Sequence, residues 1–207
     1  MAERYYDDYW RRPEPSPLSD PLRTKRVALA CRELGRVKAL DVLDAGCGAG
    51  EVVAELRRRG FRADGMEVSE VALELARRKE PRATFARHSA ESVPWPYPAS
   101  SYDAVVSFEV VEHLLQPAQL FAGAREVLKP RGWIGVTTPY HGRVKNLAIS
   151  ATRFDEHFDV EGDHIRFFSD RSLTQMVDRS GFDVIRVAHF GRLWPLWAGS
   201  FIWARRR

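Results

Sequence analysis

The chain has 207 residues, of which 44% are hydrophobic, and a formal net charge of +4 at pH 7. This length suits one domain with a sizeable core, and no apolar run is long enough to span a membrane. The first residues lack the apolar core of a secretory signal, and two cysteines, Cys31 and Cys47, fit a reducing cytoplasmic setting. The basic clusters 57–59, 77–79 and 205–207 are scattered and form no single stripe. Nucleic acid is therefore not expected as a partner.

The start of the chain is rich in aromatic side chains, which occur at Tyr5, Tyr6, Tyr9 and Trp10. A proline-rich segment, 13–21, follows and is typical of a link to the next element. Residues 1–20 are therefore predicted to form an N-terminal arm. Two alternatives stay open: the aromatic side chains form a lid over a ligand, or the arm packs on the surface.

The most informative segment is 42–50, an apolar run that ends in Asp44 and continues as a glycine-rich turn. The glycines stand at alternate positions, Gly46, Gly48 and Gly50. Glycine allows positive φ and a close approach of a ligand to the backbone. The stretch 51–59 has a helical pattern, and the N-terminus of a helix offers unpaired N–H groups. The segment therefore predicts a strand, a ligand-binding turn and a helix.

Strands and helices then alternate along the chain. Residues 62–67 are predicted as a strand ending in Glu67, roughly 20 residues past the turn, where α/β nucleotide sites place a carboxylate for ribose hydroxyls. Ser69 has the position of an N-cap for the next helix. The later elements are expected to be a strand at 102–108, a helix begun by Pro117, a helix from Ser169 to Gly181, and strands near 183–190 and 200–205. This order predicts an α/β fold, with one domain spanning 1–207 and a doubly wound parallel sheet with a late antiparallel strand.

Four segments, in the same order, resemble motifs of class I S-adenosylmethionine-dependent methyltransferases. The Asp-x-Gly-x-Gly-x-Gly pattern resembles motif I, and 87–91 resembles the segment that flanks the adenine, with Ser89 where the family usually has aspartate. Segment 109–114 resembles the E-x-x-E-H motif, and 128–133 resembles the turn before the fifth strand. The resemblance implies a Rossmann-like sheet of seven strands and S-adenosylmethionine as the cofactor.

The same resemblance implies which residues bind the cofactor. They are Asp44, Gly46, Cys47, Gly48, Gly50, Glu67, Val68, Ser89, Ala90, Glu91 and Phe108. The glycine turn is expected to shape the methionine side, Glu67 to bind the ribose, and Ser89 to Glu91 to flank the adenine. Cys47 is interpreted as a small residue packed beneath the cofactor and not as a catalytic thiol.

Segment 140–168 is the expected substrate insertion, because it begins at the carboxyl end of the fifth strand, where ligands bind in such folds. Within it, 162–169 resembles the G-T-H-x-x-x-F stretch of the ubiquinone-pathway O-methyltransferases. That resemblance implies methylation of a small molecule, at oxygen. Two alternatives stay open: a methyltransferase that acts on nucleic acid or protein, and a non-catalytic protein that binds S-adenosylmethionine.

Three residues are candidates for the catalytic step: His164, His113 and Tyr140. Histidine suits the removal of a proton from a hydroxyl near neutral pH. His164 is the predicted base, with Tyr140 and His113 shaping the pocket beside it. For each histidine the alternative is a hydrogen-bonded structural role.

Two further patterns have simple interpretations. The insertion contains potential metal donors, namely Asp155, Glu156, His157, Asp159, Asp163 and His164. Their spacing matches no metal motif, so a solvated acidic loop is favoured and no metal is expected. The tryptophan-rich run 193–203 is interpreted as a hydrophobic hairpin that closes the sheet. Cover over an apolar substrate and peripheral contact with a membrane are the alternatives.

Overall fold

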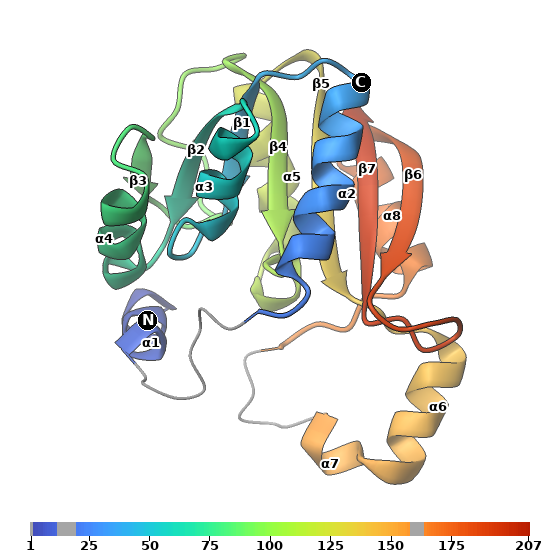
Figure 1. Ribbon diagram of the computed structural model, residues 1–207. Coiled ribbons are helices and arrows are strands. Elements are labelled where there is room, and N and C mark those ends of the chain that lie inside the picture. Colours follow the sequence, from blue (N-terminus) through green and yellow to red (C-terminus); the bar gives the residue numbers. More distant parts are fainter. Residues whose placement is uncertain (1, 12–19, 158–163) are drawn as a thin grey trace.

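The computed structural model describes residues 2–11, 20–157 and 164–207. Within these residues the chain forms a seven-stranded sheet in the order β3-β2-β1-β4-β5-β7-β6 (Figure 1). The strands are β1 (Asp41–Ala45), β2 (Arg62–Glu67), β3 (Phe85–Arg87), β4 (Tyr102–Phe108), β5 (Leu128–Pro139), β6 (Phe182–Phe190) and β7 (Gly199–Arg206). The helices are α1 (Ala2–Arg11), α2 (Arg23–Arg36), α3 (Glu51–Arg58), α4 (Glu70–Lys79), the 3-10 turn η1 (Val111–His113), α5 (Pro117–Val127), α6 (Arg143–Thr152), α7 (Phe154–His157) and α8 (Asp170–Arg179).

The pairing of the strands confirms the predicted fold class. Strands β3, β2, β1, β4 and β5 are parallel, and β7 runs antiparallel to both β5 and β6. One face of the sheet packs its apolar residues against α2, α3 and α4, and the other packs against α5 and α8. Both faces of the central strands are therefore covered, as a parallel sheet requires.

Local signals set several helix boundaries where the sequence predicts them. The Ser69 Oγ accepts a hydrogen bond from the Ala72 N–H at 3.3 Å, and the Ser169 Oγ accepts one from the Ser172 N–H at 3.2 Å. Each serine thus satisfies an N–H that the first turn of its helix leaves unpaired. Pro117 opens α5 at a position where a missing N–H costs nothing.

Segment 128–133 differs from the expected turn before the fifth strand. Strand β5 already begins at Leu128, which pairs with Tyr102, and the pairing resumes where Ala104 meets Trp133. The residues between these two points bulge from the ladder, with Arg131 at φ 62°. Because both ends of the segment pair with β4, the expected turn is absorbed as an irregularity within the strand.

Strands β6 and β7 form the hairpin that was expected from the tryptophan-rich run. Trp203 is fully buried, and its ring stacks on Trp133 at 5.6 Å with an interplanar angle of 8°. The loop between the strands leaves Leu193 and Trp194 exposed. In the part of the chain that the structure describes, no helix combines the length and the apolar character needed to cross a bilayer.

The predicted arm and insertion both lie at the carboxyl ends of the parallel strands. Helix α1 lies beside α4, whereas α6 and α7 extend away from the sheet, and α6 has no buried residue (Figure 1). Residues 1, 12–19 and 158–163 lie outside the described residues. These gaps contain most of the proline-rich segment 13–21, together with Asp159 and Asp163 from the insertion.

Candidate active site

A cavity of about 740 Å³ opens at the carboxyl ends of β1, β2 and β4. Strand β1 lies between β2 and β4, so the chain order reverses at this point of the sheet. In doubly wound folds such a switch point leaves a crevice in which ligands bind. The cavity therefore lies where the topology alone would place a ligand site.

Most of the predicted site residues line this cavity. They are Gly46, Cys47, Gly48, Glu67, Val68, Ser89, Ala90, Glu91, Phe108, His113 and His164. The exceptions are Asp44, Gly50 and Tyr140, and each lies outside the lining for a different physical reason.

The glycine-rich turn runs along one wall of the cavity. Gly46, Gly48 and Gly50 all have positive φ, at 84°, 51° and 77°. The N–H groups of Gly46 and Cys47 donate to the Met66 carbonyl at 2.8 and 2.9 Å, which ties the turn to β2. This backbone path depends on glycine because side chains rarely adopt such φ values.

Gly50 serves packing between helices and does not line the cavity. It is the N-cap residue of α3, and a Cβ atom placed on it would lie 2.9 Å from the Cβ of Ala76 in α4. Gly50 therefore lies outside the lining of this cavity, and its contact with the cofactor stays a prediction. Its glycine is required because α3 and α4 approach each other there.

Glu67 closes the end of β2 with a carboxylate held by backbone donors. Its Oε2 accepts from the Gly48 N–H at 3.1 Å, and its Oε1 accepts from the N–H groups of Val68 and Ser69 at 2.8 and 3.0 Å. Burial raises the pKa of this carboxyl, and the three N–H donors oppose the rise. A carboxylate has about four acceptor positions, so a further donor from a ligand can still be bound.

Asp44 lies behind the turn and does not reach the cavity. Its side chain is fully buried, and Oδ2 has no hydrogen-bond partner among the described residues. Burial, with smaller contributions from the negative charges of Glu67 and Glu51, raises its pKa to about 8. Asp44 therefore affects the site through the turn above it and not through direct contact, because β1 carries it into the core.

The segment after β3 is fixed at both ends while it lines the cavity. The His88 N–H donates to the Glu67 carbonyl at 2.9 Å, and the Glu91 Oε2 accepts from the Gln116 N–H at 2.6 Å. Ala90 between them is buried. Segment 88–91 is thus held between the end of β2 and the start of α5.

On the other side of the cavity lies a charged pair that the sequence analysis missed. Arg26, nearly buried in α2, places its Nη1 3.6 Å from the Glu109 Oε2, and the Thr137 Oγ1 donates to the Glu109 Oε1 at 2.7 Å. Burial raises the pKa of Glu109, and Arg26 and Thr137 oppose the rise. The sequence contains a signal for this pair, because Arg26 stands beside the apolar stripe of α2. An unpaired charge would be costly there, so the position of Arg26 predicts an acidic partner.

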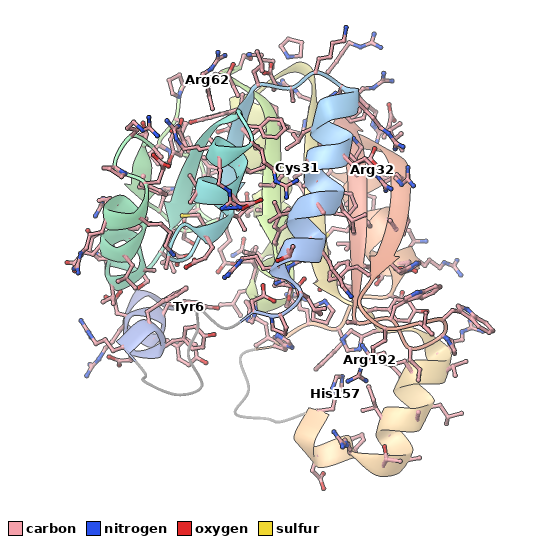
Figure 2. The ribbon with its side chains drawn as sticks, in the orientation of Figure 1. Tyr6, Cys31, Arg32, Arg62, His157 and Arg192 are labelled. Atoms are coloured by element: carbon pink, nitrogen blue, oxygen red, sulfur yellow. The ribbon has the colours of Figure 1, made fainter. Side chains whose placement is uncertain are left out.

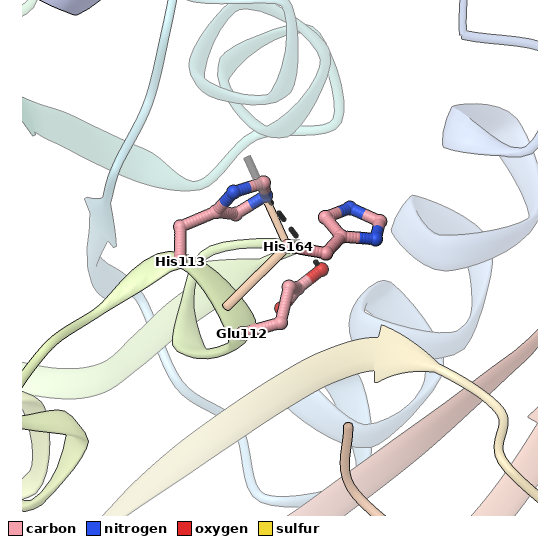
Figure 3. A group of neighbouring side chains, drawn as sticks. All are labelled: Glu112, His113 and His164. Carbon is pink, nitrogen blue, oxygen red and sulfur yellow. Dashed lines mark ion pairs between the residues drawn. The ribbon is translucent and has the colours of Figure 1, made fainter. Parts of the chain in front are cut away.

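Glu112, His113 and His164 come together at this end of the cavity (Figure 3). The two imidazole rings lie 4.8 Å apart at 66°, and the His113 Nε2 lies 4.0 Å from the Glu112 Oε1. Glu112 is fully buried, and its two carboxylate oxygens have no hydrogen-bond partner in the described part of the chain. Burial, together with the charge of Glu109, raises the pKa of Glu112 well above its usual range.

One ligand atom from each of these three residues lies within 4.8 Å of the others, so the group could hold a metal ion. Only His164 belongs to the donors considered in the sequence analysis. Asp155 is exposed, and His157 packs its ring 5.4 Å from that of His141. The geometry thus gathers a donor set from η1 and the insertion that spacing along the chain does not reveal.

Tyr140 follows β5 but does not line this cavity. Its ring lies 5.1 Å from that of His189 and 5.4 Å from that of Trp197, and its N–H donates to the Ala198 carbonyl at 2.9 Å. Tyr140 is therefore not among the residues that line this cavity, and its role in shaping the pocket stays a prediction. The crevice lies between β1 and β4, whereas the end of β5 is covered by its antiparallel partner β7.

Comparison with known proteins identifies the family. Residues 13–187 match a family model described as a methyltransferase domain. The match spans well over half of the chain, so the protein belongs to the methyltransferase-domain family. The class I S-adenosylmethionine-dependent methyltransferase family predicted from the sequence motifs is confirmed.

Named relatives agree with that family. A protein of Mycolicibacterium smegmatis, named a probable S-adenosylmethionine-dependent methyltransferase, is 31% identical over 75% of this chain and 55% of its own length. This chain thus spans about half the length of that curated relative. A ubiquinone biosynthesis O-methyltransferase of Nitrosospira multiformis is 26% identical over 90% of this chain and 79% of its own.

A solved structure supports the fold independently of sequence. The magnesium protoporphyrin IX methyltransferase of Synechocystis PCC 6803, crystallised with bound SAH, superimposes with a TM-score of 0.73. The superposition covers 100% of this chain and 98% of that chain, at 16% sequence identity. Similarity at this identity bears on the fold alone.

Proposed function

We propose that the protein binds S-adenosylmethionine in the cavity and transfers its methyl group to a hydroxyl oxygen of a small molecule. One observation carries the proposal: a single cavity joins the glycine turn and Glu67 at one end to His113 and His164 at the other. The names of the relatives, among them ubiquinone biosynthesis O-methyltransferases, support the choice of acceptor atom.

The residues present fit such a ligand. The cavity volume of about 740 Å³ lies within the range of roughly 300–1,000 Å³ of small-molecule and cofactor sites. Glu67, held by three N–H donors, keeps about one acceptor position, on Oε2, for a ribose hydroxyl. When bound, the ligand supplies a methyl group that its sulfonium already makes electrophilic.

The chain then has two tasks at the other end of the cavity. It must hold the acceptor oxygen in line with the methyl–sulfur bond, which is a large part of the rate enhancement of such reactions. It must also remove the hydroxyl proton, and we assign this to the imidazole of His164, with His113 beside it. Both histidines line the cavity, as a base requires.

The surface charges favour a small acceptor over a nucleic acid. Arg58 and Arg59 pair with Glu55 on the same helix, and Arg77 pairs with Glu70. The basic clusters of α3 and α4 are thus partly neutralised by their neighbours and do not present an open phosphate-binding stripe. The free thiols of Cys31 and Cys47 suit the cytoplasm as the proposed location.

Two measurements test the function. Calorimetry with S-adenosylhomocysteine is expected to give a binding isotherm, and no binding at millimolar ligand would refute the cofactor assignment. Incubation with labelled S-adenosylmethionine and a fractionated small-molecule extract is expected to label one fraction. Transfer to RNA or protein fractions would instead support the other enzyme classes. Binding without transfer to any fraction would support a non-catalytic protein.

A further inference from the structure

Helix α1 contributes three aromatic side chains to the cavity wall: Tyr6, Tyr9 and Trp10 (Figure 2 labels Tyr6). Trp10 packs directly on the glycine turn, because a Cβ atom placed on Gly48 would lie 2.7 Å from its ring. The aromatic residues thus cover the turn.

Asp7 supplies a polar attachment of α1 to the body of the domain. Its Oδ1 accepts a hydrogen bond from the Ser69 Oγ at 2.6 Å and another from the Val71 N–H at 3.3 Å. Ser69 is the N-cap residue of α4, and its side chain is fully buried. Asp7 therefore places a carboxylate at the positive end of a helix, which stabilises the charge. The hydrogen bond from Ser69 accordingly lowers the pKa of Asp7.

The contacts of Asp7 and of Trp10 both lead to the carboxylate of Glu67. Ser69, which binds Asp7 through its hydroxyl, donates its backbone N–H to the Glu67 Oε1. Gly48, which Trp10 covers, donates its N–H to the Glu67 Oε2. Helix α1 therefore touches two of the three residues that hold the predicted ribose-binding carboxylate.

We propose, on the basis of the function proposed above, that Asp7 is a positioning residue that latches α1 over the bound cofactor through Ser69. The latch slows departure of the ligand, because α1 must release Ser69 and Val71 before Trp10 can leave the turn. It also couples closure to the ligand, since Ser69 is bound by Asp7 on one side and Glu67 on the other.

The neighbouring residue offers a matched control. Asp8 lies on the same helix and carries the same charge. It is exposed, and its ion pair at 3.2 Å is with Arg11 of α1 itself. Exposed pairs of this kind contribute little to stability. A contribution from the charge or helix propensity of α1 would appear equally at both positions, whereas a latch would appear only at Asp7.

The experiment measures dissociation of labelled S-adenosylhomocysteine from the full chain during a chase with unlabelled ligand. Asp7→Ala is expected to speed dissociation about tenfold, the effect of losing one charge-assisted hydrogen-bond acceptor. Asp7→Asn is expected to fall between, because its amide oxygen still accepts, and Asp8→Ala to match the wild type. Hydrogen exchange of residues 2–11 is expected to slow on ligand binding in the wild type and not in Asp7→Ala.

The outcomes separate the two proposals. A wild type that does not bind S-adenosylhomocysteine refutes the proposed function. A wild type that binds, with Asp7→Ala dissociating at the same rate or with Asp8→Ala speeding release equally, refutes the latch alone. The ligand-free Asp7→Ala protein is expected to melt no more than about 4 °C below Asp8→Ala, the cost of one hydrogen-bonded contact, and a larger loss confined to Asp7→Ala would assign it a structural role instead.

Discussion

The two ends of the cavity are built in different ways. Glu67 and the glycine turn are held by backbone hydrogen bonds at the ends of buried strands. The insertion carries exposed apolar side chains at Val144, Leu147 and Phe154, and its helix α6 has no buried residue. The first end is therefore determined by the core of the fold, whereas His164 at the second end is placed by contacts that the described part of the insertion makes with that core.

His164 stands where the two regions meet. The N–H groups of the next residues, Ile165 and Arg166, donate to the Glu112 carbonyl at 3.2 and 3.0 Å. The Arg166 side chain also donates to the Leu114 carbonyl at 2.9 Å. These contacts show how a residue outside the core can be positioned accurately: the chain is attached to the segment after β4 immediately beyond it.

The largest effect is expected at the core-determined end. Glu67→Ala should weaken S-adenosylhomocysteine binding by about 100-fold, because it removes the charged acceptor proposed for a ribose hydroxyl. Calorimetry measures the affinity, and Glu67→Gln, which keeps one acceptor oxygen, should lose less. The free energy of unfolding is measured in parallel, since the three N–H donors lose their partner. An affinity equal to that of the wild type would show that the cofactor does not use this carboxylate.

At the other end, His164→Gln should separate catalysis from binding. If His164 removes the acceptor proton, turnover should fall by roughly 10²-fold while the affinity for S-adenosylhomocysteine stays near that of the wild type. Raising the pH should restore part of the rate, because the acceptor then ionises unaided. Steady-state rates with an identified acceptor provide the measurement. Unchanged turnover would leave His164 a packing residue.

The group of Glu112, His113 and His164 allows a test of metal binding. It asks whether donors that the fold brings together bind a metal although the spacing of donors along the sequence predicts none. The spacing of donors in the insertion favours no metal, whereas these three donors lie within 4.8 Å of one another. We expect Co²⁺ to bind with a visible absorption band and Glu112→Gln to weaken that binding about tenfold or more. Asp155→Asn, at an exposed acid of α7, is the control. Absence of the absorption band at millimolar Co²⁺ would support the expectation from the sequence that no metal binds.

Most residues predicted for the glycine-turn end line the cavity, because the signals for that end are local. The glycines, the acid after β2 and the caps at Ser69 and Ser169 each act over a few residues. The position of Tyr140 outside the cavity lining could not be predicted, because its surroundings depend on the pairing of β5 with β7, which brings Trp197 and His189 beside it. Arg26 and the grouping of Glu112 with His164 were missed for the same reason, since both depend on contacts between distant segments. Asp44 was predicted to contact the cofactor because the sequence pattern fixes its position along the chain. The pattern does not show how deeply its side chain is buried.

A smaller effect concerns the buried acid beneath the turn. Asp44 has a pKa of about 8 in the folded chain against 3.8 as its ordinary value, so between these values the folded state binds a proton that the unfolded state has lost. Stability from this group is therefore present at low pH and lost as the pH rises through about 8. The thermal midpoint of Asp44→Asn minus that of the wild type should therefore increase by several degrees as the pH rises from about 5 to about 9. A constant difference across that range would contradict the shifted pKa.

The smallest effect is expected on the insertion, where the contrast with the core is sharpest. Leu147 is 73% exposed on α6, so Leu147→Ala should change the free energy of unfolding by no more than about 0.5 kcal/mol. Leu43, fully buried in β1, is the matched comparison, and Leu43→Ala should cost about 3 kcal/mol through lost burial and the cavity left behind. Urea unfolding of both variants measures the difference. A loss above about 1 kcal/mol at Leu147 would mean that this side chain is covered in solution. The insertion would then owe its position to a packed interface and not to its attachment beside Glu112.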